Sequence, residues 1–291
     1  MLVSLIVSTR GRTEELKKLL NSLEQQDYKS FEVIIVDQNE DDRLSAALTS
    51  GQWSFPISRV SASEQRGVSR GRNFGASYAK GDILLFPDDD CWYPTWFLSK
   101  GVGTMTRLGC ASISGRPVEE ETGRTINGRF ANSPMWVDRK NIWTTVIEWM
   151  VFFRRDAFLE VAGYDENLGP GAQSPWGANE GQDLSLRLLA RGFACYYDSS
   201  LYGFHAELNT SRPDSGMIRK GRAYARGFGY VLRRHHYGII SICYWLVRAV
   251  GRSVMSLMKF DRQRLYYYVN VAVGRLEGWL RMTFSHTNAG G

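Results

Sequence analysis

The chain has 291 residues, of which 43% are hydrophobic and 13% aromatic, so its composition excludes an intrinsically disordered protein. This length favours one large α/β domain with an appendage. The net charge of +6 is unevenly distributed, because residues 1–211 carry 22 basic and 27 acidic side chains, whereas residues 212–291 carry 14 and 3. Such a basic tail indicates an anionic partner, either a nucleic acid or a membrane surface.

The cysteines and the apolar segments bear on the cellular compartment. The four cysteines are scattered without metal-ligand spacing and indicate a reducing, cytoplasmic environment; they are Cys91, Cys110, Cys195 and Cys243. The N-terminal stretch MLVSLIVSTRGR is apolar for only about a strand's length and lacks a basic leader, so we expect no signal peptide. No stretch reaches the roughly 18 uncharged apolar residues expected of a membrane-spanning helix.

The first part of the chain alternates between buried-strand and amphipathic-helix patterns. Residues 2–8 predict a strand, residues 13–23 a helix, and residues 31–36 a second strand. The short crossover predicts that the two strands are parallel. Further patterns predict strands at 82–86 and 147–153, and helices at 68–80, 96–108, 155–161 and 184–190. Residues 38–66 fit no clear pattern, and residues 111–143 read as strands and loops.

Acidic residues follow two of the predicted strands. Asp37 ends the second strand, and Asp88, Asp89 and Asp90 follow the strand at 82–86. Ligands of open parallel sheets bind outside the carboxyl ends of the strands, so these carboxylates should converge at one edge. Three adjacent carboxylates repel one another unless a positive partner is present. Paired carboxylates suit Mg²⁺ or Mn²⁺, and we interpret the cluster as a site for a metal bound to a diphosphate.

The order of these motifs resembles that of the family-2 glycosyltransferases with the GT-A fold. The matching stretches run over roughly residues 3–210 and are SLIVSTRGR, VIIVDQNEDD, RGVSRGRNFGASYAKGDILLFPDDDCWYP, WGANEGQDLSLRLLARG and YGFHAEL. Each motif alone is weak, but the ordered set is specific. The resemblance implies a Rossmann-like, mostly parallel sheet with flanking helices. It also implies transfer of a sugar from a nucleotide-diphosphate donor with inversion at the anomeric carbon.

The resemblance further implies roles for individual residues. It places Asp37 at the nucleobase with Thr9 nearby, and Arg72 and Asn73 on a helix that faces the donor. Donor contacts are thus expected for Thr9, Asp37, Arg72, Asn73, Asp88 and Asp89. The Mn²⁺ or Mg²⁺ ligands implied in the same way are Asp88, Asp90 and His205.

The chain departs from the family pattern where the catalytic base is expected. Aligning Asp183 with the family's helix start puts Glu180 on the usual Glu and Gly181 where an Asp base usually stands. Either Glu180 or Asp183 is then the base, and we favour Glu180 because Asp183 also suits a helix N-terminus. Trp176 is a candidate wall for the acceptor sugar. No QxxRW-like stretch follows, which favours addition of a single sugar.

The tail, residues 212–291, reads as amphipathic helices. Arg248 and Arg252 lie four residues apart and share a helix face within an otherwise apolar stretch. This pattern is typical of helices in the membrane interface, so we expect residues 212–284 to contact a membrane and no nucleic acid. Packing on the catalytic domain, residues 1–211, or a dimer interface remains the alternative.

The resemblance also suggests substrates and a location. It implies a UDP-sugar as the most common donor type and a glycan acceptor that is lipid-linked, in bacterial cell-surface polysaccharide assembly. The expected location is the cytoplasmic face of the inner membrane, with the protein peripherally bound.

Three other functions were weighed. A serine hydrolase is suggested by GVSRG at residues 67–71, with Asp183 and His205 following in hydrolase order, but the serine does not follow a buried strand. A nucleotidyltransferase would share the acidic metal ligands but normally shows a glycine-rich phosphate loop with a lysine. A catalytically impaired nucleotide-sugar scaffold would fit the glycine at position 181.

Overall fold

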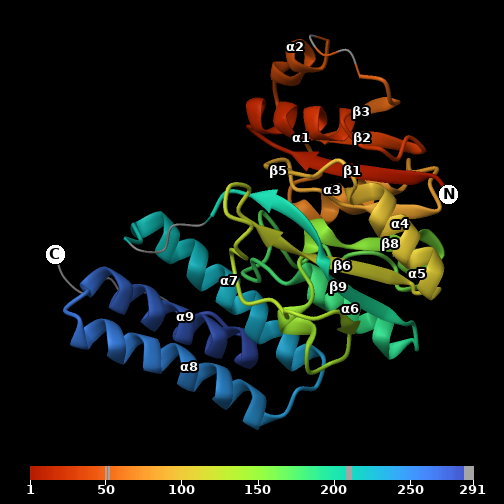
Figure 1. The fold of residues 1–291 in the computed structure, drawn as a ribbon. Coiled ribbons are helices and arrows are strands. Elements are labelled where there is room, and N and C mark those ends of the chain that lie inside the picture. Colours follow the sequence, from red (N-terminus) through yellow and green to blue (C-terminus); the bar gives the residue numbers. More distant parts are fainter. Residues whose placement is uncertain (50, 52, 208–211, 285–291) are drawn as a thin grey trace. The chain divides into compact units, whose positions relative to one another are not determined.

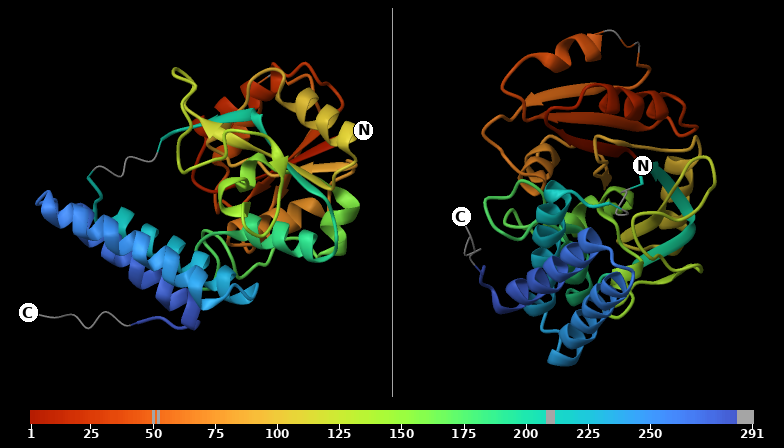
Figure 2. Two further views of the ribbon diagram at one scale, coloured as in Figure 1. Left: turned by 60° about the horizontal axis from the view of Figure 1, so that its bottom comes forward. Right: turned by 90° about the vertical axis from the view of Figure 1, so that its left-hand side faces the viewer.

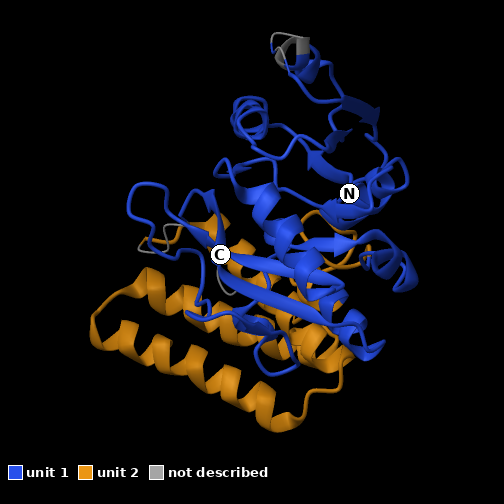
Figure 3. Ribbon diagram, turned by 45° about the vertical axis from the view of Figure 1, so that its right-hand side comes forward, with its two compact units in different colours: residues 1–165, 184–208 blue, residues 166–183, 209–291 orange. Residues whose placement is uncertain are grey.

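The computed structural model describes residues 1–49, 51, 53–207 and 212–284. The chain forms two compact units, which Figure 3 distinguishes by colour. Unit 1 comprises residues 1–165 and 184–208, and unit 2 comprises residues 166–183 and 209–291. The segment 166–183 therefore clusters with the tail, whereas the boundary drawn from the sequence at residue 211 assigned it to the first domain.

Unit 1 is built on a nine-stranded sheet (Figure 1). Its strands are β1 (Val3–Thr9), β2 (Phe31–Asp37), β3 (Ile57–Ser61), β4 (Ile83–Leu85), β5 (Cys91–Trp92), β6 (Ser112–Val118), β7 (Met135–Trp136), β8 (Phe152–Arg154) and β9 (Cys195–His205). The strand order is β3-β2-β1-β4-β8-β6-β9-β5, with β7 also paired to β9. Strands β1 to β4 are mutually parallel, as are β6 and β9, while β5, β7 and β8 pair antiparallel with their neighbours.

Helices flank this sheet and complete the α/β fold. They are α1 (Glu14–Glu24), α2 (Arg43–Thr49), α3 (Val68–Ala76), α4 (Phe97–Leu108) and α5 (Arg155–Glu160), with 3₁₀ turns at Ile142–Thr144 and Glu148–Met150. Helix α6 (Glu180–Ala190) begins in unit 2 and ends in unit 1. In α1 the predicted leucine spacing forms the buried face, made of Leu16, Leu19, Leu20 and Leu23.

Most predicted elements are confirmed, and a few are corrected. β1 and β2 are parallel, as the short crossover predicts. The prediction of a single strand over residues 147–153 is wrong, because a 3₁₀ turn over Glu148–Met150 precedes the short β8. A buried apolar run alone does not distinguish these states. Helix α3 ends at Ala76 rather than residue 80, α6 begins four residues early, and α2 and β3 occupy the unassigned region.

Close packing of α3 on the sheet depends on Gly75. A Cβ on this residue would lie 2.4 Å from Cγ2 of Ile6 on β1 and 2.6 Å from Cγ2 of Val36 on β2. Those distances are far below van der Waals contact, so a side chain here would push α3 outward. Gly75 thereby determines how far above the sheet Arg72 lies, because both residues belong to α3.

Unit 2 contains three long helices that run side by side (Figure 2): α7 (Ser215–Arg234), α8 (Ile239–Met258) and α9 (Arg262–Leu280). Helix α9 packs against both α7 and α8. The α7–α9 contact is close, because a Cβ on Gly278 would lie 2.0 Å from the carbonyl oxygen of Arg226. At the same contact the buried carboxylate of Glu277 accepts hydrogen bonds from Arg222 and Arg226.

Helix α8 meets a looser criterion for a membrane span than the uncharged stretch sought in the sequence. By length and composition, Ile239–Met258 qualifies as a possible span within the described part of the chain, even with Arg248 and Arg252 in it. Only 22% of its qualifying window is buried, unlike the core helix of a soluble protein. Its exposed apolar side chains include Ile240, Val247 and Met258.

Candidate functional site

The topology of unit 1 brings the predicted site residues to the carboxyl ends of its strands. Thr9 and Asp37 are the last residues of β1 and β2 and lie opposite each other in the parallel register. The three aspartates occupy the turn between β4 and β5. β5 then pairs with the end of β9, where Cys91 is opposite His205, so the histidine lies beside the aspartates.

Asp88, Asp90 and His205 form a cluster that could hold a metal ion. One ligand atom from each residue lies within 4.8 Å of those of the other two. The Nε2 atom of His205 is 3.1 Å from Oδ1 of Asp90. On its other side, Nδ1 of His205 lies 2.7 Å from the carbonyl oxygen of Ala206 and 3.4 Å from Nδ2 of Asn127. These contacts orient the ring so that Nε2 faces the carboxylates.

Arginines supply the positive partners that the aspartate cluster requires. Arg72 is 2% exposed, and its Nη2 donates to Oδ1 of Asp88 at 2.6 Å. Arg12 binds both Asp89 and Asp90, with Nη1 lying 2.8 Å from Oδ2 of Asp90. The cluster is therefore compensated by the protein itself. This corrects the argument that its repulsion calls for a bound metal, although the geometry still suits one.

The pKa directions within the cluster follow from burial and from the basic neighbours. Burial has the largest influence on Asp89 and raises its pKa, although Thr9 and Arg12 act against it. Burial also acts most strongly on Asp90, but the hydrogen bond and charge of His205 and the charge of Arg12 outweigh it, so this pKa is lowered. For His205, burial is opposed by the hydrogen bond to Asp90 and its charge, and the pKa is raised. His205 and Arg12 thus favour the ionised form of Asp90.

Two predicted donor-binding residues are already engaged by protein groups. Asp37 is 2% exposed; its Oδ1 accepts hydrogen bonds from Asn39, and its Oδ2 accepts from Nε and Nη2 of Arg59 at 2.9 and 2.7 Å. Asn73 forms a reciprocal pair with the backbone of Tyr164, donating at 2.9 Å and accepting at 2.9 Å. Asn73 therefore holds the 163–164 turn in place.

Thr9 and Asp89 link the first strand to the aspartate turn. The hydroxyl of Thr9 donates to Oδ2 of Asp89 at 2.7 Å. The buried Asp89 thereby fixes the turn, while the side chain of its neighbour Asp88 remains 33% exposed. The structure thus gathers Thr9, Arg72, the three aspartates and His205 into one connected group in unit 1.

The candidate bases belong to unit 2. Glu180 is buried and opens α6, directly after Asn179, whose backbone is left-handed with φ of 73°. Asp183 is 0% exposed; its Oδ1 lies 2.8 Å from Nε2 of His235 and 3.2 Å from Nε of Arg234. Asp183 thus anchors α6 to the end of α7.

Trp176 is likewise part of unit 2. Its ring stacks on that of Tyr230, with centroids 4.8 Å apart and planes at 14°. Tyr230 therefore covers one face of the Trp176 ring.

The structure identifies site residues that sequence reasoning missed. Arg12 and Arg59 hold acidic side chains at the strand ends, and Tyr164 lies 5.4 Å from the guanidinium of Arg72. Arg12 is the second arginine of STRGR and lies three residues past the first strand, so this motif was an available signal for it. No comparable local signal pointed to Arg59 or Tyr164, because their positions depend on how distant elements pack.

The hydrolase interpretation fails on geometry. Ser69, the serine of GVSRG, is buried within the first turn of α3. β3 ends at Ser61, so the serine does not stand on the sharp strand-to-helix turn of a nucleophile elbow.

The mixed sheet with acidic groups at its parallel strand ends defines a GT-A type fold, the nucleotide-sugar transferase fold. The family described as "Glycosyl transferase family 2" matches residues 4–161, more than half of the chain. The chain belongs to this family, which confirms the resemblance read from the motifs.

Curated relatives agree with the family assignment. An uncharacterized glycosyltransferase of Haemophilus influenzae is 40% identical over 94 residues, which cover 32% of this chain and 31% of that protein. The glycosyltransferase AglE of Haloferax volcanii is 24% identical over 77% of this chain and 72% of its own length. A Campylobacter jejuni protein named GalNAc(5)-diNAcBac-PP-undecaprenol beta-1,3-glucosyltransferase is 29% identical over 42% of this chain and 40% of that protein.

Solved structures share the fold at low sequence identity. The mannosyltransferase PcManGT from Pyrobaculum calidifontis, in complex with GDP-Man and Mn²⁺, superposes with a TM-score of 0.62 at 15% identity, covering 94% of this chain and 86% of that one. TarS 1–349 of S. aureus, in complex with UDP-GlcNAc, gives a TM-score of 0.58 at 15% identity, covering 98% and 93%. At this identity the likeness concerns the fold.

Proposed function

We propose that this protein is a metal-dependent, inverting glycosyltransferase that moves one sugar from a nucleotide-diphosphate donor to a hydroxyl of a glycan. The observation that carries this proposal is the convergence of Asp88, Asp90 and His205 at the carboxyl ends of the strands in a family-2 chain. A hard divalent cation takes oxygen ligands from carboxylates and from substrate phosphates. The PcManGT structure holds GDP-Man and Mn²⁺ on the same fold.

The donor atoms of the cluster fit Mn²⁺ or Mg²⁺. Asp88 and Asp90 offer carboxylate oxygens and His205 an imidazole nitrogen. The nitrogen ligand favours Mn²⁺, because Mg²⁺ is the more strictly oxygen-bound of the two. When bound, such a cation stabilises the charge that develops on a departing nucleoside diphosphate.

The remaining donor contacts follow from the strand ends. We assign Thr9, Asp37, Arg72 and Asp89 to the walls of the donor site, with Asp37 toward the nucleobase. Both carboxylate oxygens of Asp37 accept hydrogen bonds in the structure. A contact between Asp37 and the nucleobase therefore requires Arg59 to release part of this carboxylate. Arg72 orients Asp88 through its 2.6 Å hydrogen bond. Asn73 contributes indirectly, by holding the Tyr164 turn.

We assign the role of general base to Glu180. Inverting transfer needs a general base that accepts the proton of the attacking hydroxyl, and a carboxylate can serve. The carboxylate of Asp183 is engaged by His235 and Arg234, and releasing it would leave these two basic groups without their buried anion. This ion pairing favours a structural role for Asp183. We keep Glu180 as the candidate base because it aligns with the family's usual Glu ahead of the helix.

The variants Glu180→Gln and Asp183→Asn separate the two candidates. We expect Glu180→Gln to slow sugar transfer by roughly 10²-fold or more while donor affinity stays unchanged, because only proton transfer is lost. Asp183→Asn should lower thermal stability but keep transfer within several-fold. The assay measures nucleoside diphosphate release in the presence of donor, Mn²⁺ and a lipid-linked saccharide. Loss of transfer in Asp183→Asn alone would reverse the assignment.

The same assay discriminates the alternatives. A nucleotidyltransferase would release pyrophosphate in place of a nucleoside diphosphate. A nucleotide-sugar-binding scaffold would bind donor without any release, and Gly181, at the position where the family usually has its base, is the feature that favours this reading.

We further propose that the acceptor is lipid-linked and that unit 2 contacts the cytoplasmic face of a membrane. The exposed apolar side chains of α8 and the basic composition of the tail support this contact. The name of the Campylobacter jejuni relative specifies an undecaprenol diphosphate-linked acceptor for that protein. The donor is proposed to be a UDP-sugar, the donor type present in the TarS complex.

A further inference from the structure

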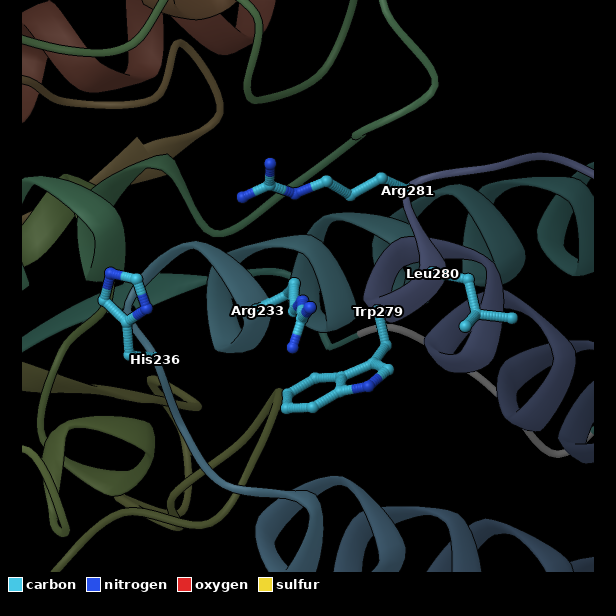
Figure 4. Close-up of a pocket in the computed structure, with 5 residues that line it drawn as sticks. All are labelled: Arg233, His236, Trp279, Leu280 and Arg281. Atoms are coloured by element: carbon cyan, nitrogen blue, oxygen red, sulfur yellow. The ribbon is translucent and has the colours of Figure 1, made fainter.

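Unit 2 contains a pocket of about 430 Å³ where the C-terminal ends of α7 and α9 meet (Figure 4). Arg233 from the last turn of α7 and His236 just beyond it line one side. Trp279 and Leu280 from the end of α9, with Arg281 directly after them, line the other. Figure 4 shows Arg281 extending toward the side on which Arg233 and His236 lie.

The basic side chains of this pocket lack an acidic counterpart. Residues 212–291 contain three acidic side chains, and each is occupied elsewhere. Asp214 caps α7, Asp261 caps α9, and Glu277 binds Arg222 and Arg226. Within residues 1–49, 51, 53–207 and 212–284, no ion pair joins a pocket arginine or His236 to a carboxylate.

The run Arg233-Arg234-His235-His236 is divided between two tasks. Its two central residues pair with Asp183, whereas its two outer residues line the pocket. The ion pairs with Asp183 thus involve the two central residues of the run and not the outer two.

Aromatic rings position the two pocket arginines without using their N–H groups. The guanidinium of Arg233 lies 5.5 Å from the ring centroid of Trp279, and that of Arg281 lies 5.6 Å from that of Tyr230. Such stacking uses the face of the guanidinium and leaves its edge donors directed outward. The edge donors are the groups that form paired hydrogen bonds with phosphate.

Helix dipoles account for only part of this arrangement. A cation in the last turn of a helix is stabilised by the dipole, which explains Arg233. The left-handed backbones of His236 and Arg281, with φ of 56° and 57°, are ordinary helix ends, because the amides that follow them bond back to Leu232 and Glu277. A ligand site is therefore indicated by the side chains that these helix ends bring together.

We propose that this pocket binds the phosphate or diphosphate group of a lipid. The two guanidinium forks and the imidazole match the charge and geometry of phosphate oxygens. Leu280 lines the pocket and Met282 directly follows Arg281; both are 49% exposed and offer an apolar surface for the chain of the lipid. The volume lies within the usual range for a small-ligand site. This inference rests on the proposed lipid-linked acceptor and locates where its phosphate is held.

The test measures binding of the full chain to phosphatidylcholine vesicles containing a small fraction of polyprenyl phosphate, without nucleotide or metal. We expect the double variant Arg233→Gln/Arg281→Gln to bind these vesicles at least about tenfold more weakly than wild type, because two charge-assisted hydrogen-bonding groups are lost. Phosphatidylcholine alone, and phosphatidylglycerol at equal surface charge, should bind wild type more weakly than the polyprenyl phosphate vesicles do.

Arg219→Gln/Arg262→Gln is the matched control, because both are exposed arginines near the starts of α7 and α9 and neither lines the pocket. An equal loss in this variant, or equal binding to phosphatidylglycerol, would overturn the proposal in favour of general surface charge. Inorganic diphosphate or UDP, at the same concentration as the polyprenyl phosphate, should not displace the protein from the vesicles. If either did, the pocket would be assigned to a soluble phosphate compound. Because donor and metal are absent, failure here leaves the proposed donor chemistry untouched.

Discussion

Asp90→Ala is expected to lower Mn²⁺ affinity at least about 100-fold and to abolish metal-dependent nucleotide binding. The carboxylate of Asp90 contributes one of three clustered ligand atoms, and its pKa is lowered, so it is ionised when a cation arrives. Its removal also frees Arg12 and the Nε2 atom of His205 from their shared partner. Isothermal titration with Mn²⁺, and then with UDP in its presence, measures both effects.

The control for this experiment is Asp156→Asn. Asp156 is an exposed carboxylate in unit 1 that pairs with Arg154 on its own surface, so the same change of charge should leave both affinities unaltered. Circular dichroism identifies any loss of fold in either variant. Unchanged nucleotide affinity of folded Asp90→Ala in the presence of Mn²⁺ would refute the metal assignment.

Glu277→Gln is expected to destabilise the α7–α9 contact by about 3 kcal/mol, the cost of leaving a buried cation unpaired. Glu277 is 0% exposed and accepts from both Nε and Nη2 of Arg222, from Nε of Arg226, and from the backbone amide of Phe284. Arg222 is only 7% exposed. Hydrogen exchange of α7 and α9 amides should accelerate roughly 100-fold.

The same carboxylate gives a pH dependence with a defined sign. Burial acts most strongly on Glu277 and raises its pKa, but Arg222 and Arg226 outweigh it and lower the pKa from 4.5 to about 2. The stabilisation is therefore complete above pH 4.5 and is lost as the pH falls through about 2. The stability of the α7–α9 contact against hydrogen exchange should therefore change less between pH 4.5 and about 2 in Glu277→Gln than in wild type. Asp261→Asn is the control, because asparagine also caps a helix; an equal effect there would contradict the account.

The carboxyl-end residues of the site could be predicted because they are local to strong strand patterns. A continuous apolar run followed by Asp37, or by Asp88 to Asp90, fixes both the strand and the place where its side chains emerge. The proximity of His205 required the motif order, since the pairing of β5 with β9 joins residues more than a hundred positions apart.

The compensating arginines and the division of the chain were not predictable in this way. Arg59 meets Asp37 only because β3 lies beside β2, and β3 falls in a stretch without clear periodicity. Segment 166–183 clusters with unit 2 through contacts such as that of Asp183 with His235. Its sequence, rich in glycine and polar residues, carries no pattern that reveals such a partner.

The central claim is that the aspartate–histidine cluster binds a nucleotide together with a metal. The most direct test is a thermal-shift panel of UDP, dTDP, GDP, CDP and ADP, each with and without Mn²⁺. A ligand that binds only the native state raises the melting temperature. We predict a shift of a few degrees for one nucleotide, UDP in the first place, and only with Mn²⁺ present. No shift with any nucleotide, or an equal shift without metal, would contradict the account.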